Sequence, residues 1–336
     1  ELTGVSTHGV SRLAVYMQRM DAGVMSRENN IRIVRESTST LVVDAGNSLG
    51  AAAAKFAMER CIAKAKETGC CFASVHSSNH FGTAAYYTRL AAAQDMIGFA
   101  CTNLKGKIAP FGSAEPYMGT NPISVAAPSD ELPVVLDMAP SVVALGKLIL
   151  AQKLGKSIPE GWALDKDGHP STNAPDVLAN IVAKNGGGIM PLGGSTEKLG
   201  SHKGYGYGML CEIFSSILSM GGTSNYCMTG GRGNICHGFM AINPAFFGDA
   251  EAIRKHLSTF LEELRESPKA DGQERIYTHG EKEVAAVKDR MENGIPVNDN
   301  TMVEVLDLCN YLGLDFGKYF GSYLPPVKKD VFKGNY

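Results

Sequence analysis

The stretch CFASVHSSNHFG, residues 71–82, links an apolar strand to the start of a helix. Residues 71–76 predict a buried strand, and a helix is expected over 82–95. Ligand-binding groups in α/β proteins gather where strands end, so His80 is expected to point into a crevice. Imidazole titrates near neutral pH and can exchange a proton with a substrate hydroxyl. From this stretch alone, a histidine that merely caps local backbone is an equal alternative.

Strand and helix signals alternate on both sides of this stretch. They predict a mixed α/β (α+β) core. Upstream we expect a helix over 5–22, two short strands in 31–43, and a helix over 48–68 capped by Asn47. Downstream we expect strands at 97–102, 122–127, 133–139 and 237–242, helices at 141–154, 203–220, 249–266, 281–293 and 299–313, and extended loops over 155–202.

The 336 residues are enough for two domains. We expect 31–247 to form a mixed-sheet domain that binds cofactor and substrate. The segments 1–30 and 248–336 are expected to form a helical domain, because the pattern after residue 248 is helical almost throughout.

Composition excludes several classes of function. Thirty-two Lys and Arg against 34 Asp and Glu give a net charge of −2, which offers no broad basic field to nucleic acid. Eight scattered cysteines indicate a reducing compartment. No stretch reaches the roughly 18 apolar residues of a membrane span, and no signal peptide is evident, so we expect a cytoplasmic protein. The chain opens on Glu1 next to a motif-like segment, and we expect a preceding piece to be missing.

Residues 7–12, THGVSR, place His8 and Arg12 four apart, on one face if the segment is helical. Arginine presents a planar fork that matches a carboxylate, and a neighbouring His and hydroxyl can hold its second oxygen. The pair could therefore clamp a carboxylate. A capped helix start with a solvated Arg12 is the alternative, and spacing alone favours it.

Further turns are less specific. Residues 119–122 (GTNP) and 137–141 (DMAPS) could meet a nucleotide through backbone groups, and 191–206 combines a Gly-rich loop with Lys203 at a helix start, which suits a phosphate. The Rossmann, Walker, zinc-site and serine-hydrolase spacings are all absent. We therefore expect no metal and no Rossmann fold.

Taken in order, these clusters resemble the malate/L-lactate dehydrogenase family of the second type, which is unrelated to the Rossmann-fold malate and lactate dehydrogenases. The resemblance runs almost end to end. Six motifs carry it: Thr7 to Arg12 for S-H-G-x-x-R, Ser78 to Gly82 for S-N-H-F-G, Gly119 to Pro122 for G-T-N-P, Asp137 to Ala139 for D-M-A, Gly146-Lys147 for G-K, and His202 to Gly206 for H-K-G-Y-G.

The resemblance implies a non-Rossmann cofactor domain, with a largely antiparallel mixed sheet flanked by helices, and a homodimer whose partner completes the site. It implies that His80 is the general acid/base. The implied substrate-binding residues are Thr7, His8, Arg12, Thr120 and Asn121. The implied cofactor-binding residues are Asp137, Met138, Ala139, Ser141, His202, Lys203, Gly204, His279, Gly280 and Glu281.

Two positions depart from the family pattern. Thr7 stands where the family usually has Ser, which keeps the hydroxyl and adds a methyl group that narrows the pocket. His279 stands where the pattern usually has Pro, which makes the backbone route past the cofactor less certain. The resemblance also implies a first helix that would precede Glu1.

The expected activity is hydride transfer between NAD(P), with NAD favoured, and a small 2-hydroxy/2-oxo carboxylate, with malate/oxaloacetate favoured. The alternatives are a ureidoglycolate dehydrogenase, a lactate or sulfolactate dehydrogenase, and a reductase of cyclic-imine carboxylates. The non-enzyme alternative is a catalytically inactive binding protein of the same fold. The joint presence of His8, Arg12, His80 and Lys203 argues against it.

Overall fold

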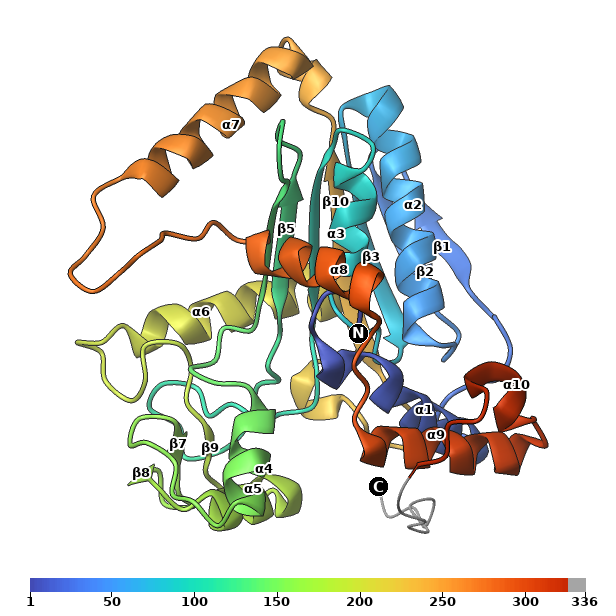
Figure 1. The fold of residues 1–336 in the computed structure, drawn as a ribbon, viewed down its shortest axis with the longest axis vertical. Helices are drawn as coiled ribbons and strands as arrows, with labels where there is room; N and C mark the ends of the chain where they lie inside the picture. Colours follow the sequence, from blue (N-terminus) through green and yellow to red (C-terminus); the bar gives the residue numbers. More distant parts are fainter. Residues whose placement is uncertain (326–336) are drawn as a thin grey trace.

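A seven-stranded sheet forms the centre of the chain in the computed structural model, which describes residues 1–325 (Figure 1). Its order is β1-β2-β3-β10-β4-β5-β6, and only β2 and β3 pair in parallel. This mostly antiparallel order confirms the predicted non-Rossmann α/β fold. The strands are β1 (Arg32–Glu36), β2 (Thr40–Asp44), β3 (Cys70–Ser78), β4 (Ile97–Thr102), β5 (Ile123–Ala127), β6 (Val134–Met138) and β10 (Ile235–Ile242).

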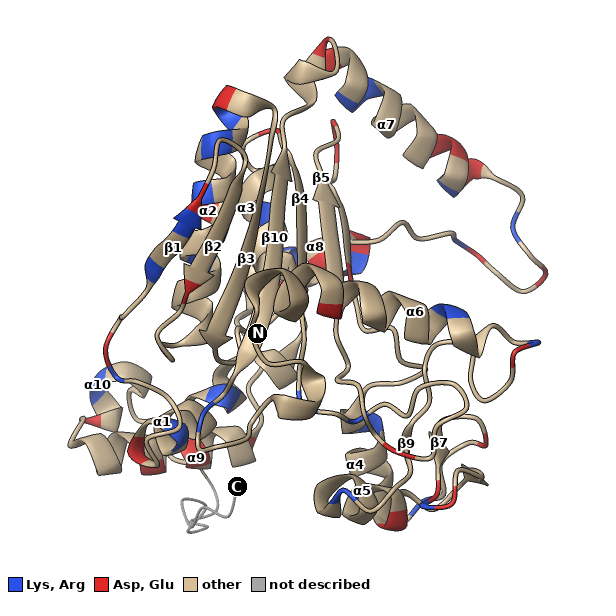
Figure 2. Cartoon of the chain, turned by 180° about the vertical axis from the view of Figure 1, so that it is seen from behind, with Lys and Arg blue, Asp and Glu red and all other residues tan. Residues whose placement is uncertain are grey.

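Helices cover both faces of this sheet. On one face, α2 (Gly50–Thr68) packs against β3 and β10, and α3 (Ala85–Ala92) packs against β4 and β5. On the other face, α6 (Ser201–Glu212) runs into a π-helical turn, η3 (Ile213–Ile217), which lies against β3 and β10 (Figure 2). Small buried alanines on α2 let that helix approach the strands closely.

The start of α2 corrects the predicted cap. Asn47 does not cap the helix: it adopts a left-handed backbone (φ 60°), and its side-chain amide donates to the Val24 carbonyl. The helix begins at Gly50 instead. A Cβ at Gly50 would lie 2.0 Å from the Asn79 carbonyl oxygen, so only glycine lets α2 abut the loop that carries His80.

The loops expected over 155–202 are also corrected. This span holds α5 (Ala174–Ala183) and three short strands, β7 (Ala163–Leu164), β8 (Pro170–Ser171) and β9 (Gly188–Ile189), in a sheet of order β8-β7-β9. They share an apolar cluster with α4 (Leu145–Lys153). Asn173 accepts a hydrogen bond from the Asp176 amide and caps α5, so a helix-start signal was present in the sequence.

The N-terminal segment is less regular than the predicted helix over 5–22. Two 3₁₀ turns, Ser6–His8 and Val10–Arg12, precede α1 (Leu13–Asp21). Gly9 separates the turns with φ −105° and ψ −133°, which lies outside the helical region. The break leaves His8 and Arg12 on turns instead of on one continuous helix.

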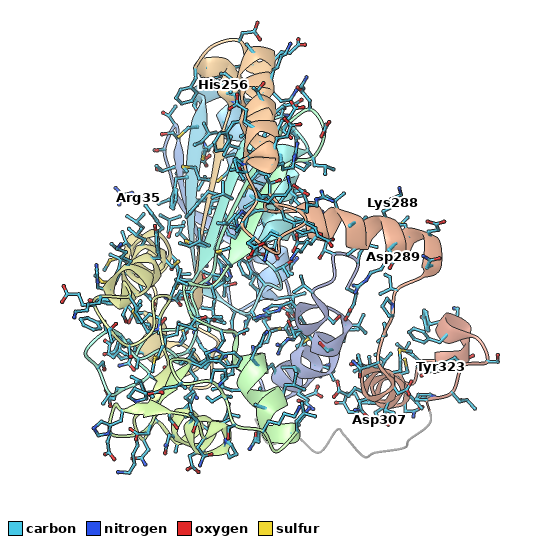
Figure 3. The ribbon with its side chains drawn as sticks, turned by 60° about the vertical axis from the view of Figure 1, so that its left-hand side comes forward. Arg35, His256, Lys288, Asp289, Asp307 and Tyr323 are labelled. Atoms are coloured by element: carbon cyan, nitrogen blue, oxygen red, sulfur yellow. The ribbon has the colours of Figure 1, made fainter. Side chains whose placement is uncertain are left out.

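Four helices end the described chain: α7 (Ala250–Glu266), α8 (Glu281–Asn293), α9 (Asp299–Leu312) and α10 (Phe316–Phe320). The first three match the predicted ranges. In Figure 3, Lys288 and Asp289 mark α8, and Asp307 marks α9. The α9 helix packs against α1, as the predicted helical domain requires, although the domain boundaries themselves stay a prediction. Residues 326–336 of that predicted domain lie outside the described residues.

Within residues 1–325, none of the helices combines the length and the apolar character that a membrane span requires.

Candidate active site

A cavity of about 2330 Å³ gathers motifs that lie far apart in the sequence. It opens among the N-terminal turns, the loop after β3, the end of β6 and the turn before α8. Ten of the predicted site residues line it: Thr7, His8, Arg12, His80, Thr120, Asp137, Met138, Ala139, His279 and Gly280. The cavity therefore joins the predicted substrate side and the predicted cofactor side in one space.

The loop that carries His80 is held by buried polar contacts. The Asn79 amide donates to the Asn47 and Ser48 carbonyls at 3.1 Å. Behind the loop, the ring of His237 bonds the Ser78 and Thr102 hydroxyls at 2.8 Å and stacks on Phe81 with ring centroids 4.6 Å apart. These contacts fix the backbone on both sides of His80, so its ring enters the cavity in a set position.

The His80 ring meets two neighbours from the N-terminal segment. The Tyr16 hydroxyl lies 2.7 Å from Nδ1, and the His8 ring stacks at a centroid distance of 5.4 Å. A tyrosine hydroxyl can donate or accept a hydrogen bond. It can therefore serve both the neutral and the protonated imidazole and leave Nε2 for another partner.

Burial and positive charge make both histidines weak bases. Burial lowers the pKa of His8 to about 4, helped by the charges of Arg12 and Lys107. Burial, followed by the charges of His8 and Arg12, holds the pKa of His80 well below its usual value. Both rings are therefore neutral at pH 7 in the free protein.

The carboxylate clamp expected at residues 7–12 is partly assembled. The Thr7 hydroxyl bonds His8 Nδ1 at 2.8 Å, and Arg12 Nε donates to the Thr7 carbonyl at 2.6 Å. Thr7 makes no helix cap, which contradicts the alternative reading of this segment. Because Nε is the bonded atom, the terminal nitrogens of the Arg12 guanidinium stay available on the cavity side of the turn.

A second group of lining residues is built around the end of β6. Asp137 accepts a hydrogen bond from the Ala85 amide at 2.8 Å and so joins β6 to the start of α3. Burial raises the pKa of Asp137. The Val135 amide donates to the His279 carbonyl, which closes the turn at Gly280 onto the same strand.

Arg89, on α3, also lines the cavity and acts electrostatically on Asp137. Its Nε and one terminal nitrogen are buried without a hydrogen-bond acceptor. Buried guanidinium donors that lack a protein partner suit a bound anion such as a phosphate. The donor set on this side of the cavity therefore fits a dinucleotide.

Six predicted site residues do not line this cavity. Asn121 is fully buried, and its amide group is used by Glu212, Gly208 and the Leu104 amide. Glu281 is committed to Thr278, Arg275 and Arg265. The others are Ser141, His202, Lys203 and Gly204. The side chains of Asn121 and Glu281 are therefore engaged by other protein groups, and a role in binding for any of the six stays a prediction.

The cavity is also lined by residues that the sequence analysis did not predict, among them Tyr16, Arg19, Arg89 and Lys107. Tyr16 follows His8 and Arg12 at the same interval of four, so a signal for it was present. Lys107 lies in an irregular loop, where no periodicity points to a side chain. Among residues 1–325, no group of three or more His, Cys, Asp or Glu side chains is arranged to hold a metal ion.

Comparison with known proteins gives the class of enzyme to which this mostly antiparallel, non-Rossmann fold belongs. The sequence model of the malate/L-lactate dehydrogenase family matches residues 1–306, and the chain belongs to this family. Its members are dehydrogenases that act on hydroxy acids with nicotinamide cofactors, so the chain is an enzyme of this kind.

Individual relatives cover nearly the whole chain. The chain is 39% identical to a malate dehydrogenase of Pyrococcus horikoshii, over 94% of this chain and 86% of the relative. It is 36% identical to an L-sulfolactate dehydrogenase of Methanocaldococcus jannaschii, over 95% and 89%. The crystal structure of a malate dehydrogenase from Entamoeba histolytica superposes with a TM-score of 0.89 at 34% identity, over 94% of this chain and 89% of that chain.

Proposed function

We propose that this chain transfers a hydride between NAD(P), with NAD favoured, and the malate/oxaloacetate pair, with His80 as general acid/base. The observation that carries this proposal is the cavity that His80, His8 and Arg12 line together with Asp137 and the Gly280 turn. The likeness to malate dehydrogenases supports the choice of substrate.

Substrate orientation falls to the N-terminal turns. The Arg12 guanidinium binds the substrate carboxylate, and His8, held by the Thr7 hydroxyl, supplies a neutral ring beside it. Thr120 lines the same cavity and offers a hydroxyl. Holding one carboxylate at two points fixes C2 relative to His80, which removes much of the entropy cost of the reaction.

Proton transfer falls to His80. During oxidation the neutral imidazole accepts the proton of the C2 hydroxyl, and during reduction the protonated imidazole returns it to the carbonyl oxygen. The Tyr16 hydroxyl at Nδ1 bonds the ring in both states and keeps its orientation. The low pKa of His80 leaves the free enzyme in the form that accepts a proton.

The proposed cofactor residues are those at the end of β6 and in the turn before α8. Asp137, Met138, Ala139 and the turn at His279 and Gly280 would hold the dinucleotide, with Arg89 facing its phosphates. A bound nicotinamide supplies or accepts the hydride at C2 of the substrate. The residues of the β6 end would orient that group.

Sulfolactate is a second candidate substrate, since the chain shares 36% identity with a sulfolactate dehydrogenase. The deciding experiment follows the loss of reduced-nicotinamide absorbance with NADH or NADPH and a panel of oxaloacetate, sulfopyruvate, pyruvate and a cyclic-imine carboxylate. Ureidoglycolate is tested in the oxidative direction, as the gain of the same absorbance from the oxidised cofactor. We expect the fastest turnover with oxaloacetate. Silence across the panel, with cofactor binding intact, contradicts the proposal.

The pH dependence of malate oxidation follows from the depressed pKa of His80. The base form of His80 is present at every pH above this lowered pKa. We therefore expect kcat/KM to stay level as the pH falls from 8 to 6 and to decline only at a lower pH, beneath the ordinary histidine value of about 6.5. A profile measured from pH 5.5 to 8.5 tests this, and an acid limb centred at pH 7 contradicts it.

We propose a homodimer. The outer face of α6 and η3 exposes apolar side chains, with Tyr207, Leu210, Ile213 and Ile217 each 41% to 52% exposed. A contiguous apolar face of this kind is typical of an interface between subunits. We expect light scattering to give twice the chain mass, and Ile213→Glu to shift the mass toward the monomer. A monomeric wild-type protein at micromolar concentration contradicts the proposal.

We also propose a cytoplasmic location. All eight cysteines are free thiols in the structure, and seven of them are buried. Unpaired thiols persist in reducing compartments. Recovery of the protein in the secreted or membrane fraction of its native cells would contradict this location.

A further inference from the structure

Lys107 reaches the cavity from a backbone that is held on both sides. Its amide donates to the Met118 carbonyl at 2.6 Å, and its carbonyl accepts from the Ile189 amide at 2.8 Å. A Cβ at the preceding Gly106 would lie 2.1 Å from the Pro116 carbonyl oxygen, so the loop packs too closely there to admit a side chain at residue 106. The side chain of Lys107 lines the same cavity as His80 and Arg12.

The charge on Lys107 is not balanced by protein. None of the ion pairs among residues 1–325 includes it. The charges that act on it come from Arg12, Arg19 and Lys105, which are all positive, and burial together with these charges lowers the pKa of Lys107. A partly buried cation among other cations costs stability, so an anion that binds there is the simplest reason for its position.

The substrate carboxylate on C1 does not use up this positive charge. His8 and His80 are neutral at pH 7, so of the three residues expected to meet the reacting end of the substrate only Arg12 carries a charge, which balances one carboxylate. Lys107 acts electrostatically on both His8 and His80, which places it near the reacting end of the cavity. The remaining charge therefore fits a second anionic group on the same substrate.

We propose that Lys107 binds the second anionic group of the substrate and so selects 2-hydroxy acids with a further carboxylate or sulfonate over monocarboxylates. This inference rests on the proposed function and narrows its substrate class. An ammonium on a flexible stem is a point charge without the planar fork of arginine, so it can accept either a carboxylate or a sulfonate.

The test compares Lys107→Met with the wild type on oxaloacetate and on pyruvate. Methionine keeps the length and apolar stem and removes the charge. We expect kcat/KM for oxaloacetate to fall about 10- to 100-fold, the range of one charge-assisted hydrogen bond, mainly through KM. With pyruvate we expect a change of less than about threefold. Lys107→Arg should retain part of the oxaloacetate activity.

Two controls separate binding from structure. Lys156→Met removes an exposed lysine outside the cavity and should leave both substrates unchanged. The thermal midpoint of Lys107→Met should equal or exceed that of the wild type, because an unpaired buried charge is removed.

Equal losses with both acids, or no loss with either, overturn this inference while leaving the proposed function standing. A raised KM for the cofactor at unchanged KM for oxaloacetate overturns it too, since Lys107 would then serve the cofactor. A wild-type enzyme that reduces neither acid removes the proposed function, and this inference falls with it.

Discussion

His80→Ala is expected to lower kcat for oxaloacetate reduction and malate oxidation by about 10²- to 10⁴-fold, the usual contribution of a general acid/base. Tyr16 and His8 stay in place in this variant. Both lie beside the His80 ring, so neither takes the place of the missing imidazole. Cofactor binding should survive, since Asp137 and the Gly280 turn belong to other elements than the loop that carries His80. Steady-state kinetics and a cofactor titration measure both effects.

The matched control is His169→Ala, whose side chain is 77% exposed and lies outside the cavity. Added imidazole should restore part of the turnover of His80→Ala and none in the control. Near-normal turnover of His80→Ala would mean that another group transfers the proton of the substrate hydroxyl.

The second large effect is expected for Arg12→Leu, with a fall in kcat/KM of about 10²- to 10³-fold for every 2-oxo acid. Removing one partner of a desolvated charge pair costs about 2 to 5 kcal/mol, which corresponds to this range. The loss should be equal for oxaloacetate and pyruvate, because both carry the C1 carboxylate. Lys107→Met, in contrast, should separate these two acids.

Arg12→Lys serves as the conservative variant. It keeps the charge but loses the bond from Nε to the Thr7 carbonyl and the two-point contact with a carboxylate. We expect an intermediate loss in kcat/KM. Full activity of Arg12→Leu on both acids would show that the carboxylate is bound elsewhere.

Much of the fold could be predicted from local sequence signals. The strands beside Cys71 and Gly98 and the helices after Asp249 have clear periodicity, so their ranges were correct within a few residues. The segment 155–202 was misread because its strands are only two residues long and pair with each other through turns. Asn47 was misread because a longer-range bond to Val24 competed with the local capping geometry.

The sequence analysis predicted site residues only where they stand in motifs, so residues outside motifs were left out. His80, His8 and Arg12 stand in motifs and were found, and the structure brings them into one cavity. Lys107 and Arg89 could not be found, because their importance comes from what surrounds them: one lacks a carboxylate partner, and the other has buried donors without acceptors. Such properties belong to the packed structure and leave no pattern in the sequence.

The most direct test of the central claim is a crystal structure of the enzyme with reduced cofactor and malate, a pair that cannot react. The account predicts that the C1 carboxylate lies against Arg12 and that the C2 hydroxyl lies within about 3.2 Å of His80 Nε2, the reach of a hydrogen bond. A complex in which malate binds away from His80, or in which another side chain holds the C2 hydroxyl, would contradict the assignment.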